Sequence, residues 1–209
     1  MFNFIAINIT DTIEIPQLIT KKISRKLVFA TEGLTIEKPN SFTPPGYLPT
    51  ESMSAFRYGI KLVRGYKFVF GCQYFIEILN DKDKITKVKL GSYYSIRKAE
   101  YGKIWSGIIH LLWVNYFVNT YNYYYDLYKI HQTFELCGIS FHFDGIGWDL
   151  QNILTWDEIA ISSYLNYFMI YNLKNKTQHK SRSFANDWNA VILQVLLKEI
   201  VKERSVLQS

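Results

Sequence analysis

Cysteine, proline and glycine are all scarce in this chain of 209 residues, and each scarcity excludes a class of protein. The two cysteines, Cys72 and Cys137, are too few for a disulfide-dense scaffold or for a zinc site with four thiolates. Two cysteines fit a protein of a reducing compartment, and a single disulfide bond between them is the alternative. With 5 prolines and 11 glycines, the chain is also unlike collagen, flexible linkers and low-complexity segments.

Common catalytic signatures are missing as well. The sequence contains no G-x-x-x-x-G-K-[ST] phosphate loop, no G-x-G-x-x-G, no G-x-S-x-G and no H-E-x-x-H. A nucleophilic Cys-His pair would have to use Cys72 or Cys137, and cysteines in buried strands are usually inert. We therefore expect a protein that is not an enzyme and that binds no cofactor.

A metal site is not expected either. The cluster of candidate ligands comprises His131, Cys137, His142 and Asp144. His142 and Asp144 are two residues apart and would share one face of a strand. The four candidate ligands together, however, follow no recognised metal-ligand spacing. Asp157 and Glu158 are adjacent and would point to opposite faces of a strand, so solvated carboxylates are expected there rather than an acid pair.

Targeting and membrane-spanning segments are not indicated. The start, MFNFIAINITDTIEIP, has no basic stretch and carries Asp11 and Glu14, unlike a signal peptide. Residues 104–125 lack formal charge, but their apolar part, Ile104 to Val118, is shorter than the roughly 20 apolar residues of a span. The segment predicts a buried, aromatic-rich helix, and we expect a soluble, cytoplasmic protein.

Hydrophobic residues are abundant, and positive charge is concentrated in one half. At 48% hydrophobic and 20% charged, the chain can bury a core, either as one large domain or as two of about 100 residues. Residues 1–127 hold 16 Lys+Arg against 10 Asp+Glu, whereas residues 128–209 hold 8 of each. The basic side chains gather between Arg57 and Lys103. They indicate a surface for an acidic protein, nucleic acid or anionic lipid, or else solvated lysines that blunt strand edges.

The first half reads as strands followed by a helix. Alternating patterns predict strands at 26–31, 34–37, 55–63, 67–79 and 85–90. Apolar residues then recur at helical spacing from Tyr101 to Asn115. Residues 39–53 hold four of the five prolines and predict a long loop, which we interpret as a functional or mobile insertion.

The second half repeats this order. It predicts strands at 133–136, 139–143, 153–161, 167–171 and 179–184. A closing helix, capped by Asn186 or Asp187, is expected to bury Trp188, Val191, Ile192, Val195, Leu196 and Ile200. Residues 74–79 with the DKDK turn align with residues 167–172 and their LKNK turn, which predicts an internal repeat.

Two segments of the second half carry a resemblance to a known family. A turn glycine with a strand, Gly138 to Phe143, precedes an Ile/Trp-containing run, Ile153 to Ile159. This order resembles bacterial pleckstrin-homology-like (PH-like) and GRAM-like folds, over about 80 residues of the second half and more loosely over 23–118. The resemblance implies a bent antiparallel barrel whose open end is plugged by a helix.

The expected fold class is therefore α+β, mainly antiparallel β, with two PH-like bent barrels each closed by a C-terminal helix. The expected parts are an extension at 1–22, a first domain at 23–127 with the insertion 39–53 and a long aromatic helix, and a second domain at 128–209. The tyrosine-rich run from Tyr116 to Tyr128 would stack bases or form a binding surface, or would pack the two halves together. We favour packing, because such helices near a junction are normally buried.

Such folds host several functions, so three hypotheses follow. The first is a non-catalytic protein-binding module with an acidic protein partner, for example a bacterial inhibitor or immunity-type protein. The others are a module for anionic lipid or membrane surfaces, and an enzyme or nucleic-acid binder whose site has no recognised motif. For the first, the candidate steering residues are Arg57, Arg64, Lys67, Lys87 and Lys89. The candidate anchors are Tyr47, Tyr93 and Tyr94.

Overall fold

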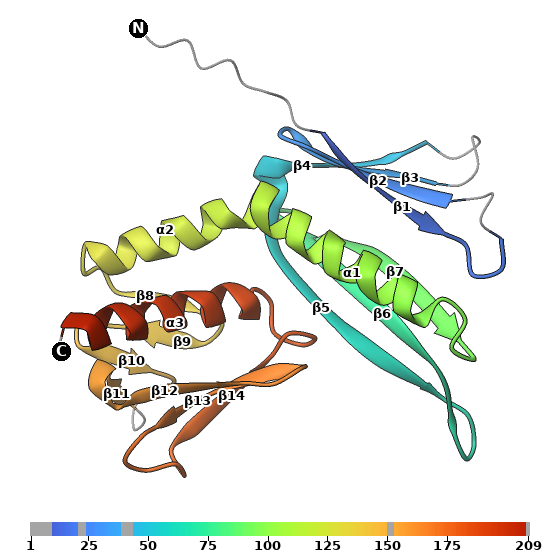
Figure 1. The fold of residues 1–209 in the computed structure, drawn as a ribbon. Helices are drawn as coiled ribbons and strands as arrows, with labels where there is room; N and C mark the ends of the chain where they lie inside the picture. The colour runs from blue at the N-terminus through green and yellow to red at the C-terminus, as the bar shows by residue number, and fades with distance from the viewer. Residues whose placement is uncertain (1–9, 21–23, 39–43, 150–152, 208–209) are drawn as a thin grey trace, which may run out of the picture. The chain divides into compact units, whose positions relative to one another are not determined.

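The computed structural model describes residues 10–20, 24–38, 44–149 and 153–207, and the chain divides into two compact units. The units are Met1–Tyr116 and Phe117–Ser209. Figure 1 shows the elements in chain order, and each unit is described by itself. No helix within these described ranges is long and apolar enough to cross a membrane.

The first unit begins with a four-stranded antiparallel sheet in the order β1-β2-β3-β4. Its strands are β1 (Asp11–Pro16), β2 (Ser24–Ala30), β3 (Gly33–Glu37) and β4 (Gly46–Pro49). Alternation along β2 buries Leu27 and Phe29, and Leu34 of β3 joins them with no exposed surface. The apolar face of this sheet therefore forms one wall of the core of the unit.

A 3-10 turn, Thr50–Ser52, leads into a three-stranded antiparallel sheet, β5-β6-β7. Its strands are β5 (Met53–Arg64), β6 (Val69–Asn80) and β7 (Ile85–Tyr93), and helix α1 (Lys98–Leu112) follows. Helix α1 contacts β1, β6 and β7. The ring of Trp105 lies 5.6 Å from that of Tyr58 and 5.7 Å from that of Tyr74, and its indole N–H donates to the carbonyl of Phe75 at 3.1 Å. One face of the second sheet is thus covered by the helix, and the other is the outer face.

The long helix expected after β7 is interrupted by a π-helical turn. The turn spans Trp113–Phe117 and joins α1 to α2 (Val118–Lys129). Tyr116 belongs to the core of the first unit, because its ring stacks on Phe29 at 6.3 Å and its hydroxyl donates to the carbonyl of Ala30. Such π-helical segments are rare and occur mostly as single turns within α-helices.

The second unit has the same composition of elements. Its four-stranded antiparallel sheet contains β8 (Phe134–Leu136), β9 (Ile139–Phe141), β10 (Gly145–Gly147) and β11 (Ile153–Thr155). A 3-10 turn, Trp156–Glu158, leads to a three-stranded sheet of β12 (Ile159–Ser163), β13 (Tyr167–Asn172) and β14 (His179–Ser183). Helix α3 (Ala190–Leu207) closes the unit and contacts α2 and β12.

Two hairpin corners have the same bonding in both units. Glu32-Gly33 and Asp144-Gly145 each turn the chain between the second and third strands. The N–H of Thr50 donates to Glu32 O at 3.0 Å, and that of Trp156 donates to Asp144 O at 3.1 Å. A Cβ on Gly33 would lie 2.5 Å from the Leu48 carbonyl oxygen, and one on Gly145 would overlap that of Leu154. Glycine is therefore required at both corners by the same close approach.

The aligned DKDK and LKNK segments are also equivalent in space. They follow the central strands β6 and β13 of the two three-stranded sheets. Asn80 Oδ1 accepts from the N–H groups of Lys82 and Lys84 at 3.1 and 2.8 Å. Asn172 Oδ1 accepts from those of Lys174 and Asn175 at 2.8 and 3.2 Å. The predicted repeat and the mainly antiparallel β class, with a helix after each set of strands, are thus confirmed.

Several details differ from the sequence-based expectations. Residues 11–16 form β1 and pair with β2, rather than lying in an extension at 1–22. The division of the chain falls after Tyr116 rather than after residue 127. Of the expected loop at 39–53, residues 39–43 lie outside the described residues, while 46–49 form β4 and 50–52 a 3-10 turn. Within the described ranges, the strands of each unit form two antiparallel sheets, one of four strands and one of three.

The end of the chain differs in detail as well. The expected strand 153–161 is broken by the turn at 156–158, so Asp157 and Glu158 do not lie on opposite faces of a strand. Helix α3 starts at Ala190, after Asn189 with φ 58°, rather than directly after Asn186 or Asp187. Ile192, Leu196 and Ile200 are fully buried as expected, but Trp188, Val191 and Val195 are only half-buried, and Leu193 and Leu197 fill the core instead.

Candidate interaction surface

The outer face of the β5-β6-β7 sheet carries an ionic triad. Arg57 and Lys87 are the direct cross-strand neighbours of Glu77. Arg57 Nη2 lies 2.7 Å from Glu77 Oε2, and Lys87 Nζ lies 2.9 Å from Glu77 Oε1. Because the strand register places the three in one row, the carboxylate is held by both cations.

Glu77 is only 6% exposed, which makes its charge state important. Burial by itself raises the pKa of this carboxyl, but the hydrogen bonds from Lys87 and Arg57 outweigh burial, and the net pKa is lowered. The carboxylate is therefore ionised at neutral pH. Two of the predicted steering residues thus share one internal counter-ion, and the triad as a whole carries one net positive charge.

Two further lysines on the same face have no such partner. Lys61 is the neighbour of Gln73, and its Nζ lies 5.0 Å from the ring centre of Phe75. Lys89 is the neighbour of Phe75 on the other side. Neither lysine forms a salt bridge with any residue that the structure describes. Phe75 itself is buried, so the outer face presents these cations above a covered aromatic ring.

At one end of the sheet, the turn between β5 and β6 and the segment after β7 expose a second group of side chains. Gly65 N–H donates to the carbonyl of Phe68 at 2.8 Å, and Tyr94 N–H to that of Phe70 at 2.8 Å. We call this group the apex surface, and it comprises Leu62, Arg64, Tyr66, Lys67, Phe68, Val69, Tyr94, Ile96 and Lys98. Tyr66, Phe68 and Tyr94 are 97%, 62% and 74% exposed. The apex surface therefore combines large apolar side chains with cations.

The backbone after β7 explains why Tyr94 points outward. Tyr94, Ser95 and Arg97 have φ values of 49°, 63° and 55°, a region that residues other than glycine seldom adopt. The side chain of Tyr93, in contrast, lies over Gly71 and Gly91. A Cβ on Gly71 would lie 2.9 Å from the Tyr93 ring, and a Cβ on Gly91 would lie 3.1 Å from the Tyr93 hydroxyl. Tyr93 is therefore half-buried on the outer face, and Tyr94 is displayed at the apex.

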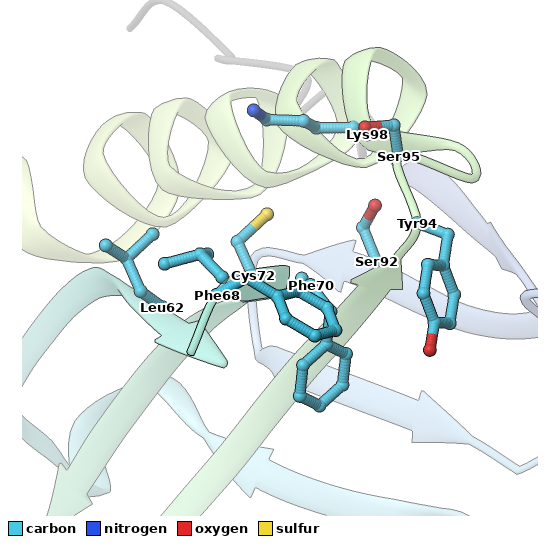
Figure 2. A pocket seen from close by; sticks show the side chains of 10 residues that line it. Leu62, Phe68, Phe70, Cys72, Ser92, Tyr94, Ser95 and Lys98 are labelled. Carbon is cyan, nitrogen blue, oxygen red and sulfur yellow. The ribbon is translucent and has the colours of Figure 1, made fainter. Parts of the chain in front are cut away.

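A pocket of about 220 Å³ opens within the apex surface. Its apolar walls come from Leu62, Phe68, Val69 and Phe70, and Lys98 is the charged residue that lines it. Figure 2 shows Cys72 and Ser92 pointing from the sheet toward the segment that carries Ser95 and Lys98. All the lining residues belong to the first unit.

Seven of the eight predicted partner-binding residues lie on this sheet or at its end. Arg57, Lys87, Lys89 and Tyr93 lie on the outer face, and Arg64, Lys67 and Tyr94 belong to the apex surface. Tyr47 lies elsewhere, on β4, where its hydroxyl donates to the carbonyl of Glu32 at 2.9 Å. The candidate residues chosen from the sequence did not include Lys61, Tyr66 and Phe68, although Tyr66 in the predicted turn and Phe68 just after it were a usable signal.

The candidate metal ligands do not form a site. The ring of His131 packs against Phe143 at 4.6 Å, and Cys137 Sγ donates to the carbonyl of Trp188 at 2.8 Å. Burial raises the pKa of the Cys137 thiol to about 12, which disfavours the thiolate that binds metals. Among the residues described, no group of three His, Cys, Asp or Glu side chains is placed to hold a metal ion.

The tyrosines of α2 pack within the second unit. Tyr124 contacts Phe134 at 5.4 Å, and Tyr128 contacts Trp156 at 5.6 Å. The hydroxyl of Tyr125 donates to the carboxylate of Glu203 on α3. These contacts fix α2 on α3 and β8, so most of these rings are structural.

Comparisons with known proteins add little. No protein-family model matches the chain, and no curated protein sequence matches it either. Among solved structures, the chain is similar to one described as "Structure of the Spt16D Pob3N heterodimer", at 10% sequence identity and a TM-score of 0.31. The match covers 86% of this chain and 97% of that chain. So low a TM-score carries no weight for fold or function.

Proposed function

We propose that this is a non-catalytic binding protein whose first unit contacts an acidic protein partner through the outer face and the apex surface. The observation that carries the proposal is the apex surface itself. It places exposed Tyr66, Phe68 and Tyr94 beside Arg64, Lys67 and Lys98, none of which forms a salt bridge with a described residue. An inhibitor or immunity-type protein, which acts by masking a partner, would have this character.

Each part of the surface has a physical role in such a complex. Contiguous exposed apolar side chains mark interaction sites, and tyrosine is enriched among the residues that supply most binding energy. Cations around them attract an acidic surface over several ångströms and raise the association rate. Lys61 and Lys89 on the outer face extend the same positive field, whereas Arg57 and Lys87 together contribute one net positive charge because they share the Glu77 carboxylate.

A second candidate function is binding to an anionic membrane surface. It is favoured by the position of Tyr66 and Phe68 at a hairpin tip next to Arg64 and Lys67, because aromatic rings and cations together suit a lipid headgroup region. Sedimentation with vesicles of phosphatidylcholine and phosphatidylserine at low and high salt tests this candidate. Binding that disappears at high salt would support it, and no sedimentation would remove it.

The experiment for the first candidate measures association kinetics with the partner purified from the native cell. Arg64→Glu, Lys67→Glu and Lys89→Glu are combined, and the matched control combines Lys82→Glu, Lys84→Glu and Lys176→Glu in exposed turns. We expect the first variant to associate at least about tenfold more slowly, with a flatter salt dependence, and the control to stay near wild type. Equal rates for both variants, or substrate turnover by the pure protein, would refute the proposal.

A further inference from the structure

We infer that the apex pocket is an anchor site for one large apolar side chain of an acidic segment in the partner protein. This inference rests on the proposed function and assigns the chemistry of the contact. It starts from a concave feature inside an otherwise convex, exposed patch. In protein complexes, the residues that contribute most to binding insert into such pockets and are surrounded by contacts that exclude water.

The size of the pocket matches a single ring or branched aliphatic group. Its volume is about 220 Å³, and an apolar cavity of roughly 150 Å³ already accommodates benzene. The walls formed by Leu62, Phe68, Val69 and Phe70 offer apolar contact on several sides. Leu62, Phe68 and Val69 are themselves more than 45% exposed, so an incoming side chain would remove their apolar surface from water.

The positive charge at the pocket favours acidic residues next to the anchor side chain in the partner's sequence. Lys98 is the charged residue of the lining, and in Figure 2 it extends above Cys72. It is the first residue of α1, where the helix dipole disfavours a cation. The stability of the helix therefore does not favour lysine at this position. A carboxylate of the partner, next to the anchor side chain, would give this lysine a favourable interaction. Arg64 and Lys67, on the same apex surface, favour further acidic residues around it.

A protein segment explains the pocket better than a lipid surface does. A bilayer interface is contacted by projecting side chains and needs no concavity of defined size, whereas an anchor residue does. The equivalent turn of the second unit supplies an internal comparison. There Tyr164, Leu165 and Tyr167 are also exposed, but no charged residue occurs between Glu158 and Lys174. Exposed apolar side chains are thus common to both turns, and the cations are particular to the first.

The test uses the full-length, ¹⁵N-labelled protein and short blocked peptides as probes. The first probe is Asp-Glu-Asp-Phe-Asp-Glu-Asp, the second replaces its Phe with Ala, and the third replaces its acidic residues with Lys. We expect saturable amide shifts at Gly71, Ser92 and Ser95 with the first probe, and at least about tenfold weaker binding of the other two. Equal binding of the Phe and Ala peptides, or shifts confined to other residues, would overturn the anchor site.

Two variants with matched controls distinguish binding at the anchor site from non-specific hydrophobic or electrostatic binding. Phe68→Ser removes an apolar wall, and Leu165→Ser is its control in the second unit, at a residue 81% exposed. Lys98→Glu reverses the charge at the pocket, and Lys82→Glu is its control. Because a glutamate suits a helix N-terminus, Lys98→Glu is expected to keep the fold intact while weakening the Phe peptide at least about tenfold.

The remaining outcomes are also decisive. Vesicles of phosphatidylcholine and phosphatidylserine that broaden the Gly71, Ser92 and Ser95 signals, while the Phe peptide leaves them unchanged, would assign the pocket to a membrane and overturn the inference. With the native partner, Phe68→Ser is expected to accelerate dissociation. If it does not, but the Arg64, Lys67 and Lys89 charge reversal still slows association, the proposed function stands and the anchor site fails.

Discussion

Replacing Glu77 by glutamine removes the negative charge that holds the ionic triad of the outer face together. Glu77 is nearly buried and accepts charged hydrogen bonds from Arg57 and Lys87, at 2.7 and 2.9 Å. Hydrogen bonds to charged groups contribute about 1.5–3 kcal/mol each. The Lys87 side chain is 47% exposed, so its share is reduced by solvent screening. We expect Glu77→Gln to cost the first unit about 2–3 kcal/mol of unfolding free energy at pH 7.

The pH dependence gives the same prediction a second test. The pKa of Glu77 is lowered in the folded state, so its stabilisation is fully present above the unfolded glutamate value of about 4.3. It is lost as pH falls through the folded pKa, because the protonated carboxyl no longer attracts the two cations. The difference between wild type and Glu77→Gln should therefore be largest near neutral pH and shrink below about pH 4.

The assay is urea unfolding followed by amide NMR signals of β6 for the first unit and of β13 for the second. Glu14→Gln is the matched control, since Glu14 and Lys26 also form a cross-strand pair, 3.2 Å apart, but one that is exposed on both sides. We expect this control to cost less than about 0.5 kcal/mol. If Glu77→Gln costs no more than Glu14→Gln, or if its cost does not change at low pH, the triad does not stabilise the sheet.

Two further predictions concern the second unit. Leu196 has no exposed surface, so Leu196→Ala should destabilise this unit by about 2–5 kcal/mol in the same urea assay; a loss below about 0.5 kcal/mol would place the helix face outside the core. Burial raises the pKa of the Cys137 thiol to about 12, so alkylation by iodoacetamide at pH 8, followed by mass spectrometry, should be at least about a hundredfold slower in the native than in the urea-unfolded protein. Comparable rates in both states would show that the thiol is accessible and ionised.

The sequence was sufficient for the fold class because most strands alternate clearly and end at polar or glycine turns. It could not identify the break between β11 and β12, since Trp156-Asp157-Glu158 contains neither glycine nor proline and has apolar residues on both sides. The first strand was missed because its two apolar inward positions in DTIEIP are too few to establish a period. Local pattern therefore predicted the elements with strong periodicity and failed at short or interrupted ones.

The candidate site shows a different limit. Seven of the eight residues that the sequence offered as partner-binding candidates lie on one sheet or at its end, because the basic residues follow consecutive strands. The sequence could not predict that Arg57 and Lys87 share the carboxylate of Glu77, which cancels one of their two charges, since that depends on the register of three strands. The pocket was equally invisible, because Leu62, Phe70 and Lys98 meet only through tertiary packing. Charge counts along a chain thus overestimate the charge that a surface presents.

The two copies of the repeat share their glycine corners but differ in strand length. β5 and β6 have 12 residues each, whereas β12 has 5 and β13 has 6. At about 3.3 Å per residue, the first hairpin is roughly twice as long as the second, and its added residues lie at the end far from the corner. The far end of the longer hairpin makes none of the close contacts that require glycine at the two corners, so the sequence of this end can vary while the turns that both units share stay the same.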